Sequence, residues 1–77
     1  MTAEARIEEI VQAYEELIGR PSGARVRFVD GSWSGELYPA RDRNHPRAIR
    51  ASARSLDAVI ATLGLAVLAL AKSEARV

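Results

Sequence analysis

The segment Ser55–Ala71 (SLDAVIATLGLAVLALA) is the most apolar part of the chain and constrains the fold more than any other segment. Ser55 can cap a helix, because a serine hydroxyl accepts a hydrogen bond from a free backbone N–H of the first turn. Asp57 in that turn and Lys72 near the other end carry charges that suit the helix dipole. Apolar residues recur at helical spacing as one stripe, which consists of Leu56, Val59, Ile60, Leu63, Val67 and Leu70. The sequence therefore predicts a long helix that is buried against the rest of the chain.

A second apolar stripe lies beside the first on this predicted helix and contains Ala61, Leu65 and Leu68. Together with Gly64 these residues make a smooth apolar surface, and an exposed surface of this kind usually marks an interface. We expect two copies of the chain to pair through it, with antiparallel helices about a two-fold axis. In the alternative, the first helix of the same chain covers the stripe.

A membrane-spanning helix is the other interpretation of the same segment. The uninterrupted apolar run from Ala58 to Ala71 is shorter than the roughly 20 residues of a span, and it contains Thr62 and Gly64. We therefore expect a core helix and no membrane partner. The 77 residues predict a single domain, residues 1–77. The chain has no cysteine and no signal-peptide pattern at its start, so we expect a cytoplasmic protein without disulfides.

The start of the chain predicts an amphipathic helix from about Ala3 to Ile18. Thr2 is placed to cap it, and Gly19 followed by Pro21 is placed to end it. Its apolar face recurs at helical spacing and contains Ile7, Ile10, Val11, Tyr14, Leu17 and Ile18. Acidic residues outside that face are candidates for docking a basic partner, with a solvated helix face as the alternative; they are Glu4, Glu8, Glu15 and Glu16.

Residues 24–38 predict a β-hairpin. Asp30 and Gly31 are the residues of a type I′ turn between the alternating segments 24–29 and 32–38. In the resulting register Phe28 lies opposite Trp33 on the core side. On the other side Arg25 lies opposite an acidic residue, Glu36, which favours the same register.

A third strand is expected at Arg47–Ala53, with an irregular segment as the alternative. Gly35 lies opposite Val26 in the hairpin and leaves room for a helix side chain or marks a bulge. The set of residues that we expect in the core is Ile7, Ile10, Val11, Tyr14, Leu17, Val26, Phe28, Trp33, Leu37, Ile49, Val59, Ile60, Leu63 and Val67.

The element order is therefore helix, three strands, helix. Consecutive antiparallel strands form a meander, and both helices must cover its one apolar face, which predicts a two-layer α+β sandwich. This order resembles the double-stranded RNA-binding domain. That family contacts RNA with its first helix, the loop between its first two strands and basic residues at the start of its last helix. Here the first helix is acidic, the turn is Asp30-Gly31 and the last helix opens with Ser55-Leu56-Asp57, so the RNA-binding function is not carried over.

The net charge of +1 conceals a strong segregation of charge. Residues 1–19 hold five Glu against one Arg, for a net −4, and residues 20–54 hold eight Arg against three acidic residues, for a net +5. Guanidinium groups with an aromatic ring can contact phosphates and stack on a base. The candidate surface for a partner or a nucleic acid contains Arg25, Arg27, Tyr38, Arg41, Arg43, Arg47 and Arg50.

Catalytic chemistry has little support in this sequence. His45 is the single histidine, and Asp42 with His45 gives only two metal ligands in a polar loop. The glycine-spaced segment 31–35 belongs to the hairpin and not to a phosphate-binding loop. We expect no enzyme activity, no metal and no cofactor. The expected function is that of a small homodimeric protein-interaction module, a regulator or inhibitor of the kind found among bacterial or phage accessory proteins. Weak nucleic-acid binding by the Arg-rich sheet face and the 39–47 loop is the alternative.

Overall fold

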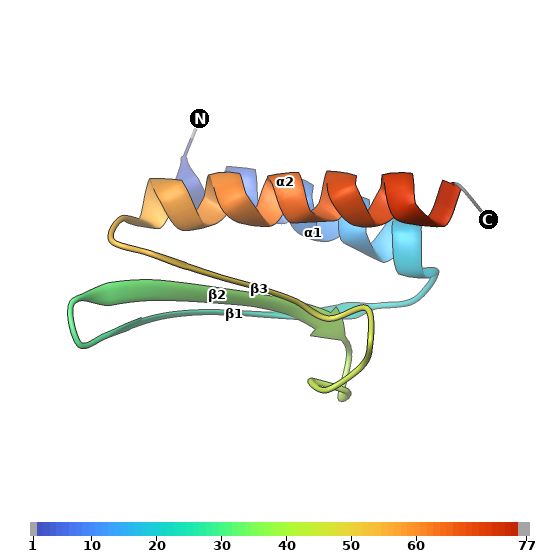
Figure 1. Ribbon diagram of the computed structural model, residues 1–77, viewed down its shortest axis with the longest axis horizontal. Helices are drawn as coiled ribbons and strands as arrows, with labels where there is room; N and C mark the ends of the chain where they lie inside the picture. The colour runs from blue at the N-terminus through green and yellow to red at the C-terminus, as the bar shows by residue number, and fades with distance from the viewer. Residues whose placement is uncertain (1, 76–77) are drawn as a thin grey trace.

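Two helices lie on one side of a three-stranded antiparallel sheet in the computed structural model, which describes residues 2–75 (Figure 1). The strands are adjacent in the order β1-β2-β3, as a meander requires. The predicted α+β fold and its element order are confirmed. The element bounds are α1 Ala3–Ile18, β1 Ser22–Val29, β2 Ser32–Pro39, β3 Ile49–Ala53 and α2 Leu56–Ala75.

The starts of both helices and the end of α1 follow the capping pattern in the sequence. The Thr2 hydroxyl accepts a hydrogen bond from the Ala5 N–H at 3.1 Å, and the Ser55 hydroxyl accepts one from the Ala58 N–H at 3.1 Å. Gly19 closes α1 in the left-handed conformation, with φ +72°, and its N–H donates to the Glu15 carbonyl at 2.9 Å. A side chain is disfavoured in this conformation, so glycine is the residue suited to this helix end.

The hairpin has the predicted register. Asp30 and Gly31 both have positive φ, 52° and 78°, as a type I′ turn demands. Phe28 lies opposite Trp33, and the remaining pairs follow in step along both strands. The two strands are slightly longer than predicted, and β3 begins at Ile49, two residues later than predicted.

The core lies where α2 crosses the sheet. α2 packs against β2 and β3, while α1 lies beside α2 and contacts β1 and β2. Gly35 makes the close approach of α2 possible, because a Cβ at that position would lie 2.9 Å from both Leu63 Cδ1 and Val59 Cγ1. The buried apolar side chains are Tyr14, Leu37, Ile49, Val59, Ile60, Leu63 and Val67.

One predicted core residue is wrongly placed. Phe28 is 57% exposed and stacks on the Trp33 ring, with ring centroids 5.1 Å apart, instead of entering the core. The cause is the position of the helical layer: α2 covers β2 and β3, so the edge strand β1 is only thinly covered. Several other predicted core residues are only half-buried, because residues 2–75 form two layers and no third layer covers their outer side. They are Ile7, Ile10, Val11, Leu17, Val26 and Trp33.

The helix α2 is also long and apolar enough to cross a membrane, judged by length and composition alone. Its most apolar 18-residue window has a mean hydropathy of 1.8, and 22% of that window is buried within the protein. A core helix of a folded domain satisfies the same criteria, and α2 supplies four of the buried core residues.

Candidate interaction surfaces

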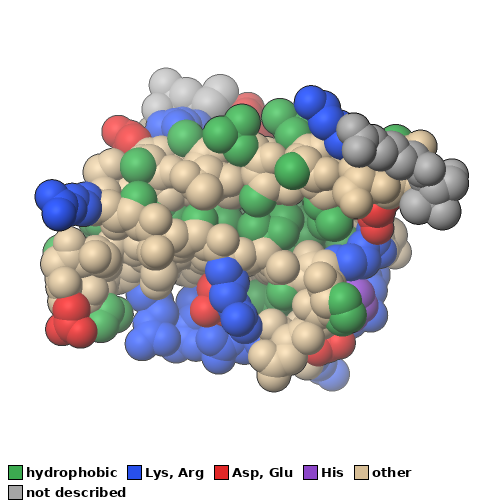
Figure 2. Space-filling model, viewed as in Figure 1, with side chains coloured by type: hydrophobic (Ala, Val, Ile, Leu, Met, Phe, Trp, Pro, Cys, Tyr) green, Lys and Arg blue, Asp and Glu red, His purple; other side chains and the backbone are tan. Residues whose placement is uncertain are grey.

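The outer face of α2 is apolar and uncovered. Leu65 is 67% exposed and Leu68 58% exposed, and Ala61 beside them is exposed as well. No charged residue occurs between Asp57 and Lys72, and Figure 2 shows green apolar side chains along this helix at the surface. The alternative in which the first helix covers this second stripe is therefore wrong. We use "α2 outer face" below for the surface of Ala61, Leu65 and Leu68.

The fourth residue predicted for this surface lies elsewhere. A Cβ on Gly64 would lie 3.6 Å from Ile10 Cδ1 of α1, so Gly64 sits in the contact between the two helices. The helices run side by side in the same direction, because Arg6 of α1 pairs with Asp57 at the start of α2, with 3.1 Å between Nη1 and Oδ1. This parallel contact uses the glycine side of α2 and leaves its leucine side free.

The open face of the sheet, opposite the helices, carries exposed arginines. Arg25 and Arg27 project from β1 and Arg50 projects from β3. Within residues 2–75 none of these three takes part in an ion pair. Figure 2 shows the resulting blue cluster below the sheet. Tyr38 closes one end of this face, because its ring lies over Gly23 of β1 and fills the space that a Cβ there would need.

Arg25 and Glu36 lie opposite each other, as predicted, but they do not form an ion pair. The Glu36 carboxylate accepts from Arg43 instead, with 3.1 Å between Arg43 Nη2 and Glu36 Oε2. Arg50 in turn donates to the Arg43 carbonyl at 3.3 Å. Glu36, Arg50 and four neighbours line a shallow depression of about 300 Å³; the neighbours are Ser34, Gly35, Ala51 and Ser52. Arg41 and Arg43 are exposed in the loop between β2 and β3.

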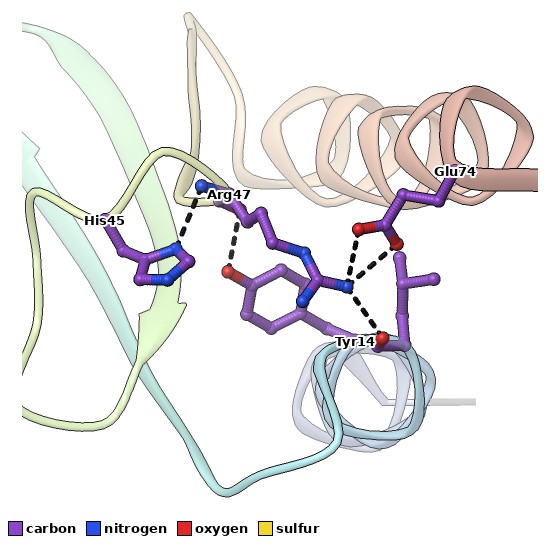
Figure 3. Close-up of polar contacts among 5 residues, drawn as sticks. Tyr14, His45, Arg47 and Glu74 are labelled. Carbon is purple, nitrogen blue, oxygen red and sulfur yellow. Dashed lines mark hydrogen bonds and ion pairs between the residues drawn. The ribbon is translucent and has the colours of Figure 1, made fainter. Parts of the chain in front are cut away.

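Arg47 does not belong to this surface. Its guanidinium lies between the ends of the helices, where Nη2 donates to the Leu17 carbonyl at 2.8 Å and pairs with Glu74 at 2.7 Å (Figure 3). The buried Tyr14 hydroxyl donates to the Arg47 carbonyl at 2.8 Å, and His45 Nδ1 accepts from the Arg47 N–H at 3.1 Å. Burial raises the pKa of Tyr14, against the opposing effect of Arg47.

These contacts tie α1, α2 and the loop before β3 together, so Arg47 holds the fold and is not free for a partner. Sequence reasoning missed this network. Its one available signal was Tyr14 itself, a hydroxyl-bearing side chain on an otherwise apolar helix face, which needs a hydrogen-bond partner when buried. Nothing in the sequence singles out Arg47 as that partner.

The predicted acidic surface also contains both exposed residues and one residue that is used within the fold. Glu4, Glu8 and Glu16 are exposed on α1. Glu15 is half-buried, and its carboxylate accepts from the Ser22 N–H at 2.9 Å, which fixes the start of β1. In the part of the chain that the structure describes, no three His, Cys, Asp or Glu side chains are grouped as a metal would require.

No protein-family model, no curated protein and no solved structure matches this chain.

Proposed function

We propose that the chain is a homodimeric protein-interaction module that pairs through the α2 outer face and acts as a regulator or inhibitor by protein contacts. The observation that carries the proposal is the exposure of Leu65 and Leu68, 67% and 58%, on a helix that is uncharged over four turns. Full burial of a leucine contributes about 1.5–3 kcal/mol. Burial of the exposed parts of two leucines from each copy therefore favours association, and it must exceed the cost of lost translational and rotational freedom.

A second copy is the occupant favoured by the symmetry of this face. Leu65 lies near the middle of the uncharged segment, so an antiparallel pair of α2 helices brings each leucine against the other copy's leucines. The small side chain of Ala61 lets the two backbones approach. An antiparallel pair also brings Lys72 of each copy near the end of the other helix where Asp57 already pairs with Arg6.

Light scattering tests the proposal. The expected mass at tens of micromolar is twice the chain mass of 8.4 kDa. Leu65→Glu combined with Leu68→Glu should give a folded monomer, judged by circular dichroism. The matched control is Phe28→Glu with Val29→Glu, which places the same charge on residues that are 57% and 49% exposed. This control should remain a dimer. A monomeric parent chain, or loss of pairing only in the control, would contradict the proposal.

Weak nucleic-acid binding by the open sheet face is the second candidate. It is supported by the exposure of Arg25, Arg27 and Arg50 with no ion pair inside residues 2–75. The involvement of Arg47 in the fold and of Arg43 with Glu36 reduces the free positive charge. Retention on heparin or duplex DNA that falls steeply with added salt would support it. No retention in low salt would exclude it.

A further inference from the structure

The free edge of β1 is a second feature that the fold leaves without a partner. β1 pairs with β2 on one side, and within residues 2–75 no strand pairs with its other side. Val29 and Ser32 flank the two-residue turn and form a hydrogen-bonded pair, so alternate residues of β1, counted from Val29, direct their backbone groups to β2. The N–H and C=O groups of Ala24, Val26 and Phe28 therefore point away from the sheet.

Ser22 shows what such an outward group requires. It shares the alternation of Ala24, so its N–H also points away from β2, and that N–H donates to the Glu15 carboxylate at 2.9 Å. Further along β1, no side chain of the described residues 2–75 makes a comparable hydrogen bond. The edge from Ala24 to Phe28 is thus open to hydrogen bonds from an added strand.

The two rows of side chains on β1 differ in character. On the side of the helices, Ala24 and Phe28 are exposed and Val26 is half-buried, which gives an apolar row. On the open side, Arg25 and Arg27 are exposed and, within residues 2–75, take part in no ion pair. An added strand therefore meets an apolar row on one face and two cations on the other.

A second copy of β1 fits this edge poorly in the registers that use the middle of the strand. In antiparallel self-pairing centred on Val26, Arg25 of each copy lies directly opposite Arg27 of the other. Centring the pair on Arg25 or on Arg27 places that arginine opposite itself. Like charges directly opposite each other destabilise a strand pair, and arginines on an edge strand oppose self-association.

We propose that the free edge of β1 binds an extended acidic segment of a partner protein as a fourth strand. Alternate residues of that segment are acidic and lie beside Arg25 and Arg27; the residues between them are apolar and lie beside Ala24, Val26 and Phe28. Backbone hydrogen bonds hold the segment, and the alternation of charge and apolar side chains selects it. α2 packs on β2 and β3, towards the other edge, so this site does not depend on pairing of two copies.

A synthetic peptide tests the site directly. The probe has the sequence Thr-Val-Glu-Val-Glu-Leu-Thr with blocked ends, and its matched control carries lysine in place of both glutamates. The glutamate peptide should slow amide exchange of Ala24, Val26 and Phe28 by about tenfold or more, measured by NMR on the full chain. The lysine peptide should leave these amides unchanged. No binding at about 1 mM, or binding that protects none of the three amides, overturns the proposal.

A charge swap separates strand addition from general attraction to cations. Arg25→Glu combined with Arg27→Glu should lower the affinity for the glutamate peptide by about tenfold and should allow the lysine peptide to bind. Arg41→Glu with Arg50→Glu makes the same change in charge away from this edge and should alter affinity by no more than about threefold. The proposal is overturned if both double variants lose affinity for the glutamate peptide equally. It is also overturned if a DNA duplex binds the chain while the glutamate peptide protects none of the three amides. The mass of the same samples reports dimer formation separately, so failure of either proposal is recognised on its own.

Discussion

Replacement of Gly35 by alanine tests how α2 is seated on the sheet. An added Cβ would lie 2.9 Å from Leu63 Cδ1 and from Val59 Cγ1, whereas carbon atoms pack best at about 3.5–4.0 Å. Both neighbours are buried, with 2% and 0% of their surface exposed, so neither has space to move without shifting α2. Overpacking of this kind costs about 1–3 kcal/mol.

A favourable effect opposes that cost. Gly35 does not have a positive φ, so alanine is conformationally acceptable there and stabilises by about 0.4–1 kcal/mol through the unfolded chain. The net expectation is a loss of about 1–2 kcal/mol in the free energy of unfolding, because a contact at 2.9 Å to two buried side chains outweighs the entropic gain. Urea unfolding measures it as a lower midpoint at an unchanged slope.

Two further variants make the Gly35 result specific. Ser34→Ala, on the open side of the same strand, should change the free energy of unfolding by no more than about 0.5 kcal/mol. In a Val59→Ala background, where one of the two close contacts is gone, Gly35→Ala should cost less than it does in the parent chain. A Gly35→Ala variant as stable as the parent, or a cost that Val59→Ala leaves unchanged, would refute the packing argument.

Three other variants each test a single position. Tyr14→Phe leaves the Arg47 carbonyl without its donor and should lower the free energy of unfolding by about 1–2 kcal/mol in urea. Burial raises the pKa of Tyr14 above its ordinary value of 10.0, so the unfolded chain releases that proton first as the pH rises. The contribution of Tyr14 to the free energy of unfolding is therefore fully present below pH 10 and is lost as the pH rises through the folded pKa. Tyr14→Phe should reduce this alkaline loss of stability, and an unchanged alkaline profile would contradict the prediction. Trp33→Ala should cost less than the roughly 3–5 kcal/mol of a fully buried aromatic, since Trp33 is half-buried, and its native fluorescence should be intermediate between buried and free indole. Gly31→Ala should cost about 1–2 kcal/mol by thermal unfolding, because φ is +78° and no neighbour lies within 4 Å; no loss would show that the turn rearranges.

Local chemistry allowed much of the fold to be predicted from the sequence. Thr2, Gly19 and Ser55 cap helices through groups within a few residues of them, so the helix ends needed no tertiary information. The Asp30-Gly31 turn sets the hairpin register by itself, because a two-residue type I′ turn fixes which residues face each other. The apolar α2 outer face was equally visible, since helical periodicity alone separates Leu65 and Leu68 from the buried stripe.

The tertiary structure decided which of these surfaces are occupied. Phe28 is on the core side of its strand by alternation, yet it is exposed because α2 crosses β2 and β3 and leaves the edge strand thinly covered. Gly64 was grouped with the leucines, but the parallel contact with Ile10 takes it into the helix pair. Arg47 was grouped with the surface arginines, but it binds Glu74 from a distant part of the chain. Periodicity assigns a residue to a face of its own helix or strand. The position of one element on another depends on contacts between residues far apart in sequence. Those contacts determined that the β1 edge is open and that the α2 outer face is exposed.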